Sequence, residues 1–404
     1  MTRLPNSLQP AWPLVKRLHR FSTLVAGWIF RPVSRLQGSR ALPRRATLTA
    51  ADTASREPDV ARLHVLDAGE PIRRAPAQGT PDGHWVFDKA RVFDVPPRFS
   101  LEIDGGVVVG DYGANLTPHG TLDFETSEYF GISGWREHPV FLRRRLPPIE
   151  HVDGTLVALA TRGGSGNYYH FLLDVLPRFG VFEETMPGRR ADALYVPNGA
   201  AWQRDLLDLV GLGDHTIVQT RADRAVSADH LVVPSLPNPL EVAPRSTVDW
   251  LRSRLVPHDV TDKPKRIYVT RGSARNTRRI VQEEALFELL QQRGFVRIEP
   301  GGMSVRDQID HYAAAEVVVA PHGAALTNLV FARPGVKVLE IFPASYVNSC
   351  FWAISASIPD SRYTYLVAGD ADAYGRGTPM NRIQADIDVD PAVVIAAVDR
   401  LIEA

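Results

Sequence analysis

A histidine and a glycine stand where a predicted strand gives way to a predicted helix, in the segment APHGAALTNLVFARPG (320–335). Three valines, 317–319, precede them, and the apolar run 324–331 follows. Ligands of parallel α/β sheets bind at the carboxyl ends of strands. The unpaired N–H groups of a helix N-terminus attract anions. His322 and Gly323 therefore predict a seat for a negatively charged group.

Small residues around this turn would let a phosphate approach the backbone. Gly323 and Ala324 have little or no side chain, and Thr327 and Asn328 come about one helical turn later, where they could add hydrogen bonds. A tight strand-to-helix turn without a ligand has the same composition and remains the structural alternative.

A second strand, RIYVTR (266–271), ends in arginine at the same predicted edge of the sheet. A guanidinium is a planar, bidentate donor suited to phosphate. Together with the helix N-terminus it predicts a diphosphate site, with a solvated basic loop as the alternative. The arginines concerned are Arg271, Arg275, Arg278 and Arg279.

A lone carboxylate, Glu340, interrupts the apolar strand VKVLEIF (336–342). A buried carboxylate is costly unless it has a partner. Glu340 could bind a ribose hydroxyl pair at the rim of the sheet, or it could form a structural ion pair.

A third pattern lies in the first half, in the predicted helix 167–179. Asn167, His170 and Asp174 fall on one face of that helix. A histidine and an aspartate one turn apart can act as a base and the group that orients it. Pro177 should end or kink the helix. A polar helix face without catalytic function is the alternative.

Several chemistries lack their signatures. No GxGxxG follows a strand and no Walker A loop is present, which argues against dehydrogenases, epimerases and ATPases. Cys350 is the one cysteine, so no internal disulfide or zinc-type cluster is expected. Asp370 and Asp372 form a carboxylate pair of a kind that often arises by chance. We expect no metal site.

From residue 155 onward, strands alternate with helices in two α/β halves. The strands read as continuous apolar runs, which is typical of a buried parallel sheet. Ser304 followed by Asp307 predicts a helix start. The predicted divisions are an arm (1–60), an N-terminal domain with a β-rich beginning (61–258), a C-terminal domain (259–385) and a C-terminal helix (386–404).

The net charge of zero hides a strong asymmetry. Residues 1–51 hold nine Lys or Arg and no Asp or Glu, and the remainder carries a net charge of −9. The apolar run 21–30 is too short to span a bilayer. This arm could lie on an anionic membrane surface, remain loosely packed or act as a targeting segment.

Four stretches together resemble glycosyltransferase family 61. This family is of the capsular polysaccharide biosynthesis type and was formerly called a domain of unknown function. The four stretches are NYYHFLLDVLPR (167–178), RIYVTRGSARNTRRIVQEEAL (266–286), the segment 294–335 that contains the histidine and glycine, and VLEIFP (338–343). Their order and spacing carry the resemblance over roughly residues 155–345. Residues 1–150 match no family that we can name.

The resemblance implies a GT-B-like fold, with two Rossmann-like domains facing across a cleft. Carried over by position, the donor-binding residues would be Arg271, Arg275, His322, Gly323, Ala324, Thr327, Asn328 and Glu340. On the acceptor side would be Asn167 and Tyr169. The catalytic base would be His170 or Asp174, and which of the two remains open.

The implied activity is inverting transfer of a sugar from a nucleotide sugar, with a UDP-sugar the expected donor, to a hydroxyl of a glycan or lipid-linked glycan. Such enzymes generally need no metal or other cofactor. The expected setting is bacterial surface polysaccharide synthesis in the cytoplasm, peripheral to the inner face of the membrane, with no nucleic acid partner. The alternative is a non-catalytic nucleotide-sugar or glycan-binding module with the same fold.

Overall fold

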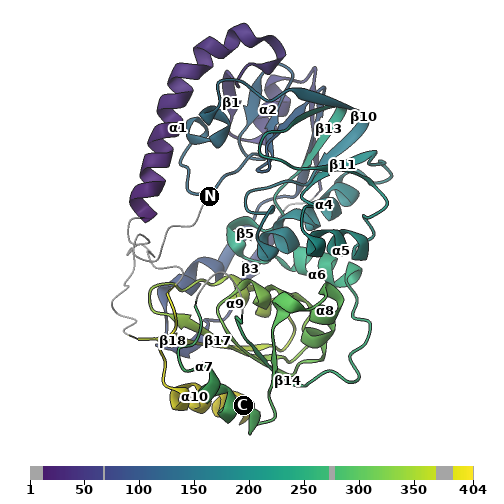
Figure 1. The fold of residues 1–404 in the computed structure, drawn as a ribbon. Helices are drawn as coiled ribbons and strands as arrows, with labels where there is room; N and C mark the ends of the chain where they lie inside the picture. Colours follow the sequence, from purple (N-terminus) through teal and green to yellow (C-terminus); the bar gives the residue numbers. More distant parts are fainter. Residues whose placement is uncertain (1–11, 67–68, 273–277, 370–384, 404) are drawn as a thin grey trace. The chain divides into compact units, whose positions relative to one another are not determined.

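A computed structural model describes residues 12–66, 69–272, 278–369 and 385–403 of the chain (Figure 1). The chain divides into two compact units. The N-terminal unit comprises Leu14–Glu70 and Pro96–Pro237, and the C-terminal unit comprises chiefly Pro71–Val95 and Asn238–Ala404. Both combine sheets with helices, which confirms the predicted α/β class.

The C-terminal unit is built on a six-stranded sheet with the order β15-β14-β16-β17-β18-β4, in which paired neighbours run parallel. Its strands are β4 (Gln78–Thr80), β14 (Arg266–Val269), β15 (Val296–Ile298), β16 (Val317–Pro321), β17 (Lys337–Pro343) and β18 (Arg362–Ala368). The chain moves outward from β14 to β15 and then returns to the other side of β14 for β16. The strand order therefore reverses between β14 and β16, and ligands of open α/β sheets bind at such a point.

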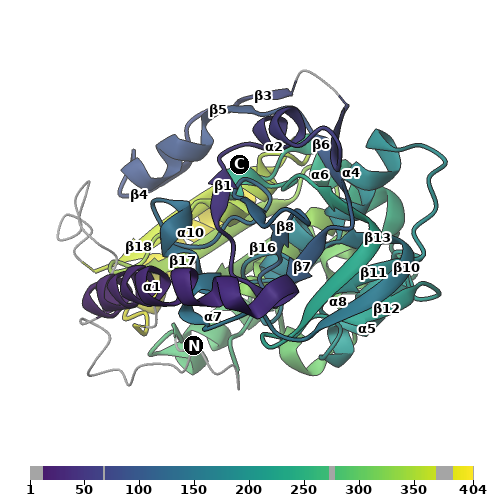
Figure 2. The same ribbon diagram turned by 90° about the horizontal axis from the view of Figure 1, so that it is seen from above.

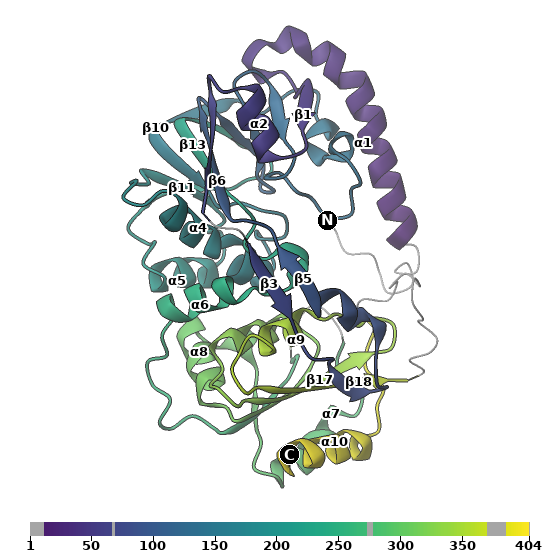
Figure 3. The same ribbon diagram turned by 180° about the vertical axis from the view of Figure 1, so that it is seen from behind.

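Helices cover this sheet on both sides (Figure 1). They are α6 (Arg245–Arg254), α7 (Glu283–Gln291), α8 (Val305–Ala314), α9 (Cys350–Ser355), α10 (Pro391–Glu403) and the 3-10 helix η9 (Ala324–Phe331). The helices α7 and α10 pack together and share one hydrophobic core with the strands. The helices α6, α8 and α9 pack against η9. A separate pair, β3 (Glu70–Arg73) and β5 (Val92–Val95), lies side by side in Figure 3, with a 3-10 helix at Trp85–Ala90 before β5.

The N-terminal unit contains a ten-stranded sheet whose parallel part has the order β13-β10-β11-β12 (Figure 2). Those strands are β10 (Ile149–Ala158), β11 (Ala193–Val196), β12 (Thr216–Gln219) and β13 (Ala225–Pro234). The chain runs from β10 outward to β12 and then returns to place β13 on the other side of β10. Here too the strand order reverses, between β10 and β13.

Antiparallel strands extend this sheet beyond β13, as the β-rich prediction for this region indicated. They are β2 (Ala61–Val65), β6 (Phe99–Asp104), β7 (Val107–Val109), β8 (Ala114–Leu116) and β9 (Thr121–Asp123), while β1 (Arg45–Thr47) pairs in parallel with β9. The helices of the unit are α1 (Trp12–Ser34), α2 (Ala50–Arg56), α3 (Tyr168–His170), α4 (Pro177–Thr185) and α5 (Ala201–Leu209), and 3-10 helices lie at Arg35–Arg40, Trp135–Glu137 and Pro139–Leu142.

The helix predicted over 167–179 is not regular. A short turn, α3, passes into a π-helix at Phe171–Val175, and α4 begins at Pro177. The backbone N–H of Leu176 bonds to the carbonyl of Phe171, five residues back, at 3.1 Å. Proline has no backbone N–H to donate. The wide π-helical turn therefore ends before Pro177, where α4 begins. The helix predicted over 324–331 also departs from the α-helical form, because it is a 3-10 helix.

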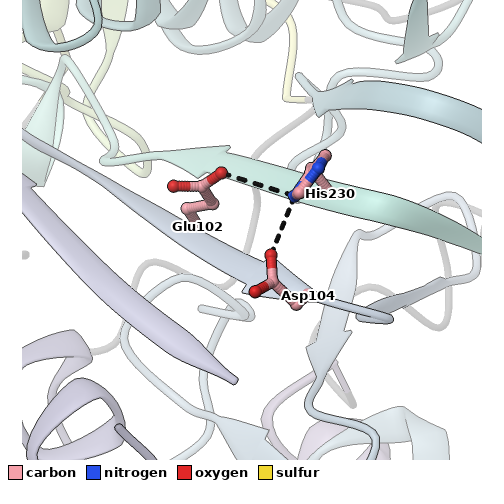
Figure 4. Close-up of side chains that lie close together, drawn as sticks. All are labelled: Glu102, Asp104 and His230. Carbon is pink, nitrogen blue, oxygen red and sulfur yellow. Dashed lines mark hydrogen bonds and ion pairs between the residues drawn. The ribbon is translucent and has the colours of Figure 1, made fainter. Parts of the chain in front are cut away.

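A network of charged side chains links the strands β2, β6 and β13. Glu102 accepts hydrogen bonds from Arg62 and pairs with His64 at 3.0 Å. Asp104 accepts two hydrogen bonds from Arg62, each 2.7 Å long, and contacts His230 at 2.8 Å (Figure 4). Burial alone would raise the pKa of Glu102, but the hydrogen bonds from His64 and Arg62 outweigh it and lower that pKa. The network therefore favours the ionised carboxylate.

The variant Glu102→Gln should lose about 1–3 kcal/mol of unfolding free energy at neutral pH, because its buried partners lose a charged acceptor. A carboxyl whose folded pKa is lowered stabilises the protein above about pH 4, and this contribution disappears as the pH falls through the folded pKa. The wild type should therefore lose more stability than the variant on acidification. Urea unfolding at several pH values measures both effects. Asp223→Asn, at an exposed ion pair with Arg221, is the control and should lose much less. Equal losses for the two variants would contradict the role of the network.

Candidate functional site

The first candidate centre lies in the C-terminal unit, where the strand order reverses. β16 ends at Pro321, and the N–H of His322 still bonds to the carbonyl of Ile341 in β17 at 2.8 Å. Gly323 then caps η9. The valine run thus carries His322 to the carboxyl edge of the sheet, as the sequence predicts.

His322 belongs to a buried chain of hydrogen bonds. Its Nδ1 lies 2.5 Å from Oε1 of Glu340, and the hydroxyl of Tyr363 donates to Oε2 of Glu340. His322 is 4% exposed and Glu340 is fully buried. Phe342 stacks on the imidazole with ring centroids 5.0 Å apart, and Tyr346 and Phe351 contact it as well. The ring is held in one orientation.

Burial disfavours the charged form of each member of this pair. It lowers the pKa of His322 well below its ordinary value, and the charges of Arg278 and Arg271 lower that pKa further. Burial raises the pKa of Glu340 well above its ordinary value, although Tyr363 and Arg278 act in the opposite direction. Burial therefore weakens this pair as a counter-ion for the arginines beside it.

Two guanidinium groups converge on the turn after β16. Nη1 of Arg271 donates to the carbonyl of His322 at 3.4 Å, and Nε of Arg278 donates to the same carbonyl at 3.1 Å. Burial lowers the pKa of Arg271 to about 10, and the charges of Arg278 and Arg279 add to that shift. Like charges crowd here, and a bound anion would relieve their repulsion.

Steric crowding explains why a glycine follows His322. A Cβ at Gly323 would lie 2.0 Å from Nη1 of Arg271. Glycine therefore lets a guanidinium lie against the backbone at the start of η9. Ala324 and Ala325, the first residues of that helix, are partly exposed although their surroundings are buried. Backbone N–H groups and guanidinium groups thus meet at one place.

The remaining predicted donor residues take different positions. Thr327 and Asn328 are fully buried: Thr327 donates to the carbonyl of Ala324 at 2.7 Å, and Asn328 donates to Gln308 at 3.0 Å. Both side chains stabilise η9 through these hydrogen bonds. Glu340 lies beneath His322 rather than at the surface of the unit. Arg275 lies outside the described residues.

The second candidate centre lies in the N-terminal unit, after the carboxyl end of β10. The side chain of Asn167 caps α3 by accepting from the N–H of Tyr169 at 2.9 Å. Nδ1 of His170 lies 2.7 Å from Oδ2 of Asp174, and both side chains are buried, as is Tyr169. The predicted pairing of His170 with Asp174 is therefore present, on the first turns of the irregular helix.

Glycine also shapes this second centre. Gly163 has φ +79°, and a Cβ there would lie 2.6 Å from Cδ2 of His170. The ring of Phe130 covers the imidazole, with centroids 5.1 Å apart. The imidazole is thus packed between the glycine loop and an aromatic ring. The π-helical turn that carries Asp174 is a feature often found at functional sites.

Arg178 is a residue whose importance the sequence pattern did not indicate. It is 1% exposed, and it donates to the carbonyl of Ala160 after β10 and to that of Pro234 at the end of β13. It therefore bridges the two strands between which the order reverses. Burial lowers the pKa of Arg178 to about 10, and the charge of Asp174 opposes that shift. A buried cation thus stands beside the carboxylate that holds His170.

Two clusters among the described residues have ligand atoms close enough to hold a metal ion. The first is Glu102, Asp104 and His230, whose carboxylates already bind Arg62 (Figure 4). The second is His151 with Asp153 and Asp229, all exposed. Neither includes a predicted site residue. Asp370 and Asp372 lie outside the described residues.

The pKa of His322 can be tested by following its ring nitrogens with ¹⁵N–¹H NMR between about pH 5 and 8. We expect a neutral imidazole throughout, because its pKa lies well below 6.5. The variant His322→Gln assigns the signal by its loss. Since the unfolded chain takes up a proton near pH 6.5 and folded His322 does not, this residue should also make stability fall below that pH. A titration centred near pH 6.5 would contradict the buried, neutral imidazole.

Comparison with known proteins bears on both centres. No curated protein matches the chain. Residues 168–339 match the family model described as Glycosyltransferase 61. The matched range includes His170, Asp174, Arg271 and His322, and thus residues of each candidate centre. The match confirms the predicted resemblance over this part of the chain: residues 168–339 are similar to glycosyltransferase family 61.

Proposed function

We propose that this protein is a glycosyltransferase that transfers a sugar, with inversion at the anomeric carbon, from a nucleotide sugar to a hydroxyl of a glycan or lipid-linked glycan. The observation that carries the proposal is the crowding of Arg271 and Arg278 at the start of η9. A nucleoside diphosphate, the leaving group of such a reaction, carries the opposite charge to these guanidinium groups.

The donor diphosphate would bind against the guanidinium groups and the first N–H groups of η9. Arginine binds phosphate oxygens bidentately, and a helix N-terminus adds partial positive charge. As the bond to the sugar breaks, negative charge gathers on the diphosphate. Donors already aimed at that charge stabilise the transition state more than the ground state. A UDP-sugar is the donor that we expect.

We assign Glu340 and Tyr363 a positioning role. Glu340 is fully buried and bonded on both oxygens, so a contact with the donor ribose would require it to leave His322. In our proposal the carboxyl and the phenol fix the imidazole, and the imidazole in turn fixes the backbone turn whose carbonyl holds Arg271 and Arg278.

The base would come from the N-terminal unit. We propose that His170 accepts the proton on Nε2 and that Asp174, which contacts Nδ1, orients the imidazole. The carboxylate would then stabilise the imidazolium formed when the acceptor hydroxyl loses its proton.

The reaction requires both centres to meet, and we propose that the units face each other across a cleft in the GT-B manner. The acceptor oxygen then bonds to the anomeric carbon, and the bond from that carbon to the diphosphate oxygen breaks. Its electron pair leaves with the nucleoside diphosphate, and the acceptor proton passes to Nε2 of His170. The acceptor class implied by the family resemblance is a bacterial surface polysaccharide or its lipid-linked precursor.

Incubation of the protein with a panel of nucleotide sugars should release nucleoside diphosphate from one of them, slowly without acceptor and faster with it. Arg271→Ala should lower the rate with that donor by about 10²–10³. Gly323→Ala should also weaken nucleoside diphosphate binding while keeping the fold, because its methyl group displaces only the flexible end of Arg271.

Two substitutions serve as controls for that experiment. Arg333→Ala removes an exposed arginine paired with Glu316, and Gly302→Ala adds a methyl group where no atom lies within 4 Å. Both should behave as wild type. Tight binding of a nucleotide sugar with no release under any condition would instead support a binding module. Full activity in Arg271→Ala would remove Arg271 from the site.

Replacement of the proposed base should slow the chemical step without weakening the binding of nucleoside diphosphate. His170→Ala should lower turnover by about 10²–10⁴ and leave nucleoside diphosphate affinity unchanged. Asp174→Asn should lower turnover less and shift the pH dependence of the rate, because it removes the negative charge that stabilises the imidazolium. Turnover that survives in His170→Ala but is lost in Asp174→Asn would make Asp174 the base.

A further inference from the structure

An amphipathic helix that packs on a core turns its apolar face inward. The helix α1 instead turns its apolar face away from the N-terminal unit. The face toward the N-terminal unit carries small or polar residues, among them Thr23 and Ser34, which are fully buried, and Gly27. A Cβ at Gly27 would lie 3.2 Å from Cβ of Phe141, so the helix approaches the unit closely there. Most of the large apolar side chains of α1 consequently face away from the unit, although Phe30 packs against its core.

These outward residues form a continuous apolar stripe. Leu14, Leu18, Phe21, Val25 and Trp28 follow one another at alternating steps of four and three residues, which keeps them on one side of a helix. Phe21 is 65% exposed and Trp28 is 80% exposed. Exposed apolar side chains of α1 on either side widen the stripe: Leu24, Ile29 and Val33. A patch of this kind marks an interaction surface.

Polar contacts hold α1 in this orientation. Arg20 pairs with Glu137 at 2.8 Å and donates to Ser133, also at 2.8 Å. Arg31 donates to the carbonyl of Arg44 at 2.7 Å and lies 4.6 Å from the ring centre of Trp135. The stripe is therefore presented by a docked helix and does not require unfolding to become available.

An arginine-lined hollow adjoins the stripe. It measures 210 Å³, and its walls include Trp28, Arg31, Arg35 and Arg44. Burial lowers the pKa of Arg31, and the positive charges of Arg136 and Arg35 lower it further. The Nε of Arg31 is buried without an acceptor among the described residues. The hollow combines crowded positive charge with an exposed indole, which suits the phosphate of a lipid headgroup.

The charge of this region decides between a membrane and a second copy of the chain. The stripe spacing would also suit a helix pair, but residues 1–51 hold nine Lys or Arg and no Asp or Glu. Two such helices would repel each other and could form no ion pairs along their flanks. An anionic bilayer complements both the charge and the apolar stripe. No helix among the described residues has the length and apolar character needed to cross a membrane.

We propose that α1 lies on the surface of an anionic membrane, with its apolar stripe at the boundary between headgroups and acyl chains and a lipid phosphate in the arginine hollow. Surface binding stands independently of the proposed transfer reaction. It would bring the protein to any acceptor that is itself carried on a lipid.

Co-flotation of the full chain with vesicles tests this proposal. The protein should float with phosphatidylcholine vesicles that contain phosphatidylglycerol, and much less with pure phosphatidylcholine or at high salt. The double variant Phe21→Ser, Trp28→Ser should weaken binding about tenfold or more. Arg35→Glu with Arg44→Glu should weaken binding to the anionic vesicles and leave the weak binding to neutral ones unchanged.

Matched controls in the same unit are Leu48→Ser, at an exposed leucine outside α1, and Arg221→Glu, at an exposed arginine. Both should float like wild type, and circular dichroism should show all variants folded. Wild-type binding that does not depend on phosphatidylglycerol, or that survives in both double variants, would overturn the proposal. So would dimerisation in buffer that Phe21→Ser, Trp28→Ser abolishes, since a second copy would then be the occupant of the stripe.

Discussion

The proposed donor site depends on one electrostatic constraint: the side chains of Arg271 and Arg278 crowd together at the turn after β16, beside a buried histidine–glutamate pair. Burial lowers the pKa of His322 and raises that of Glu340, which weakens this pair as a counter-ion for Arg271 and Arg278. Had Glu340 remained ionised at the surface, it would have neutralised the guanidinium groups and weakened any anion site. The cost of burying Glu340 is reduced by its two hydrogen-bond partners.

Each unit has arginine side chains at the place where its parallel strands reverse their order, partly buried in the C-terminal unit and fully buried in the N-terminal unit. In the C-terminal unit, Arg271 and Arg278 bond to the carbonyl that follows β16. In the N-terminal unit, Arg178 bonds to carbonyls at the ends of β10 and β13. The first arrangement concentrates positive charge on a partly exposed turn. The second buries the cation fully, where it links the two strands and lies close to Asp174. The same residue type thus serves binding in one unit and positioning in the other.

Local sequence patterns predicted much of the framework. The valine run gave β16, the serine at 304 caps α8 by accepting from the N–H of Asp307, and the His170–Asp174 spacing brought those side chains into contact. These features depend on neighbours in sequence. Tyr363 could not be found in this way, because it reaches Glu340 only through the pairing of β18 with β17.

The same limit explains the other differences. Arg178 acts on carbonyls in distant strands, and β4 joins the sheet of the C-terminal unit from far along the chain. The π-helical turn before Pro177 depends on tertiary packing that helical periodicity does not report. The exposure of the apolar residues of α1 could not be deduced from their spacing either, since the same spacing describes a helix packed on a core.

A crystal structure with bound UDP would test the central claim most directly. The account predicts the diphosphate oxygens within hydrogen-bonding distance of Arg271, Arg278 and the first N–H groups of η9, with Glu340 still beneath His322. A diphosphate bound elsewhere on the protein, or Glu340 released from His322 to meet the ribose, would contradict it.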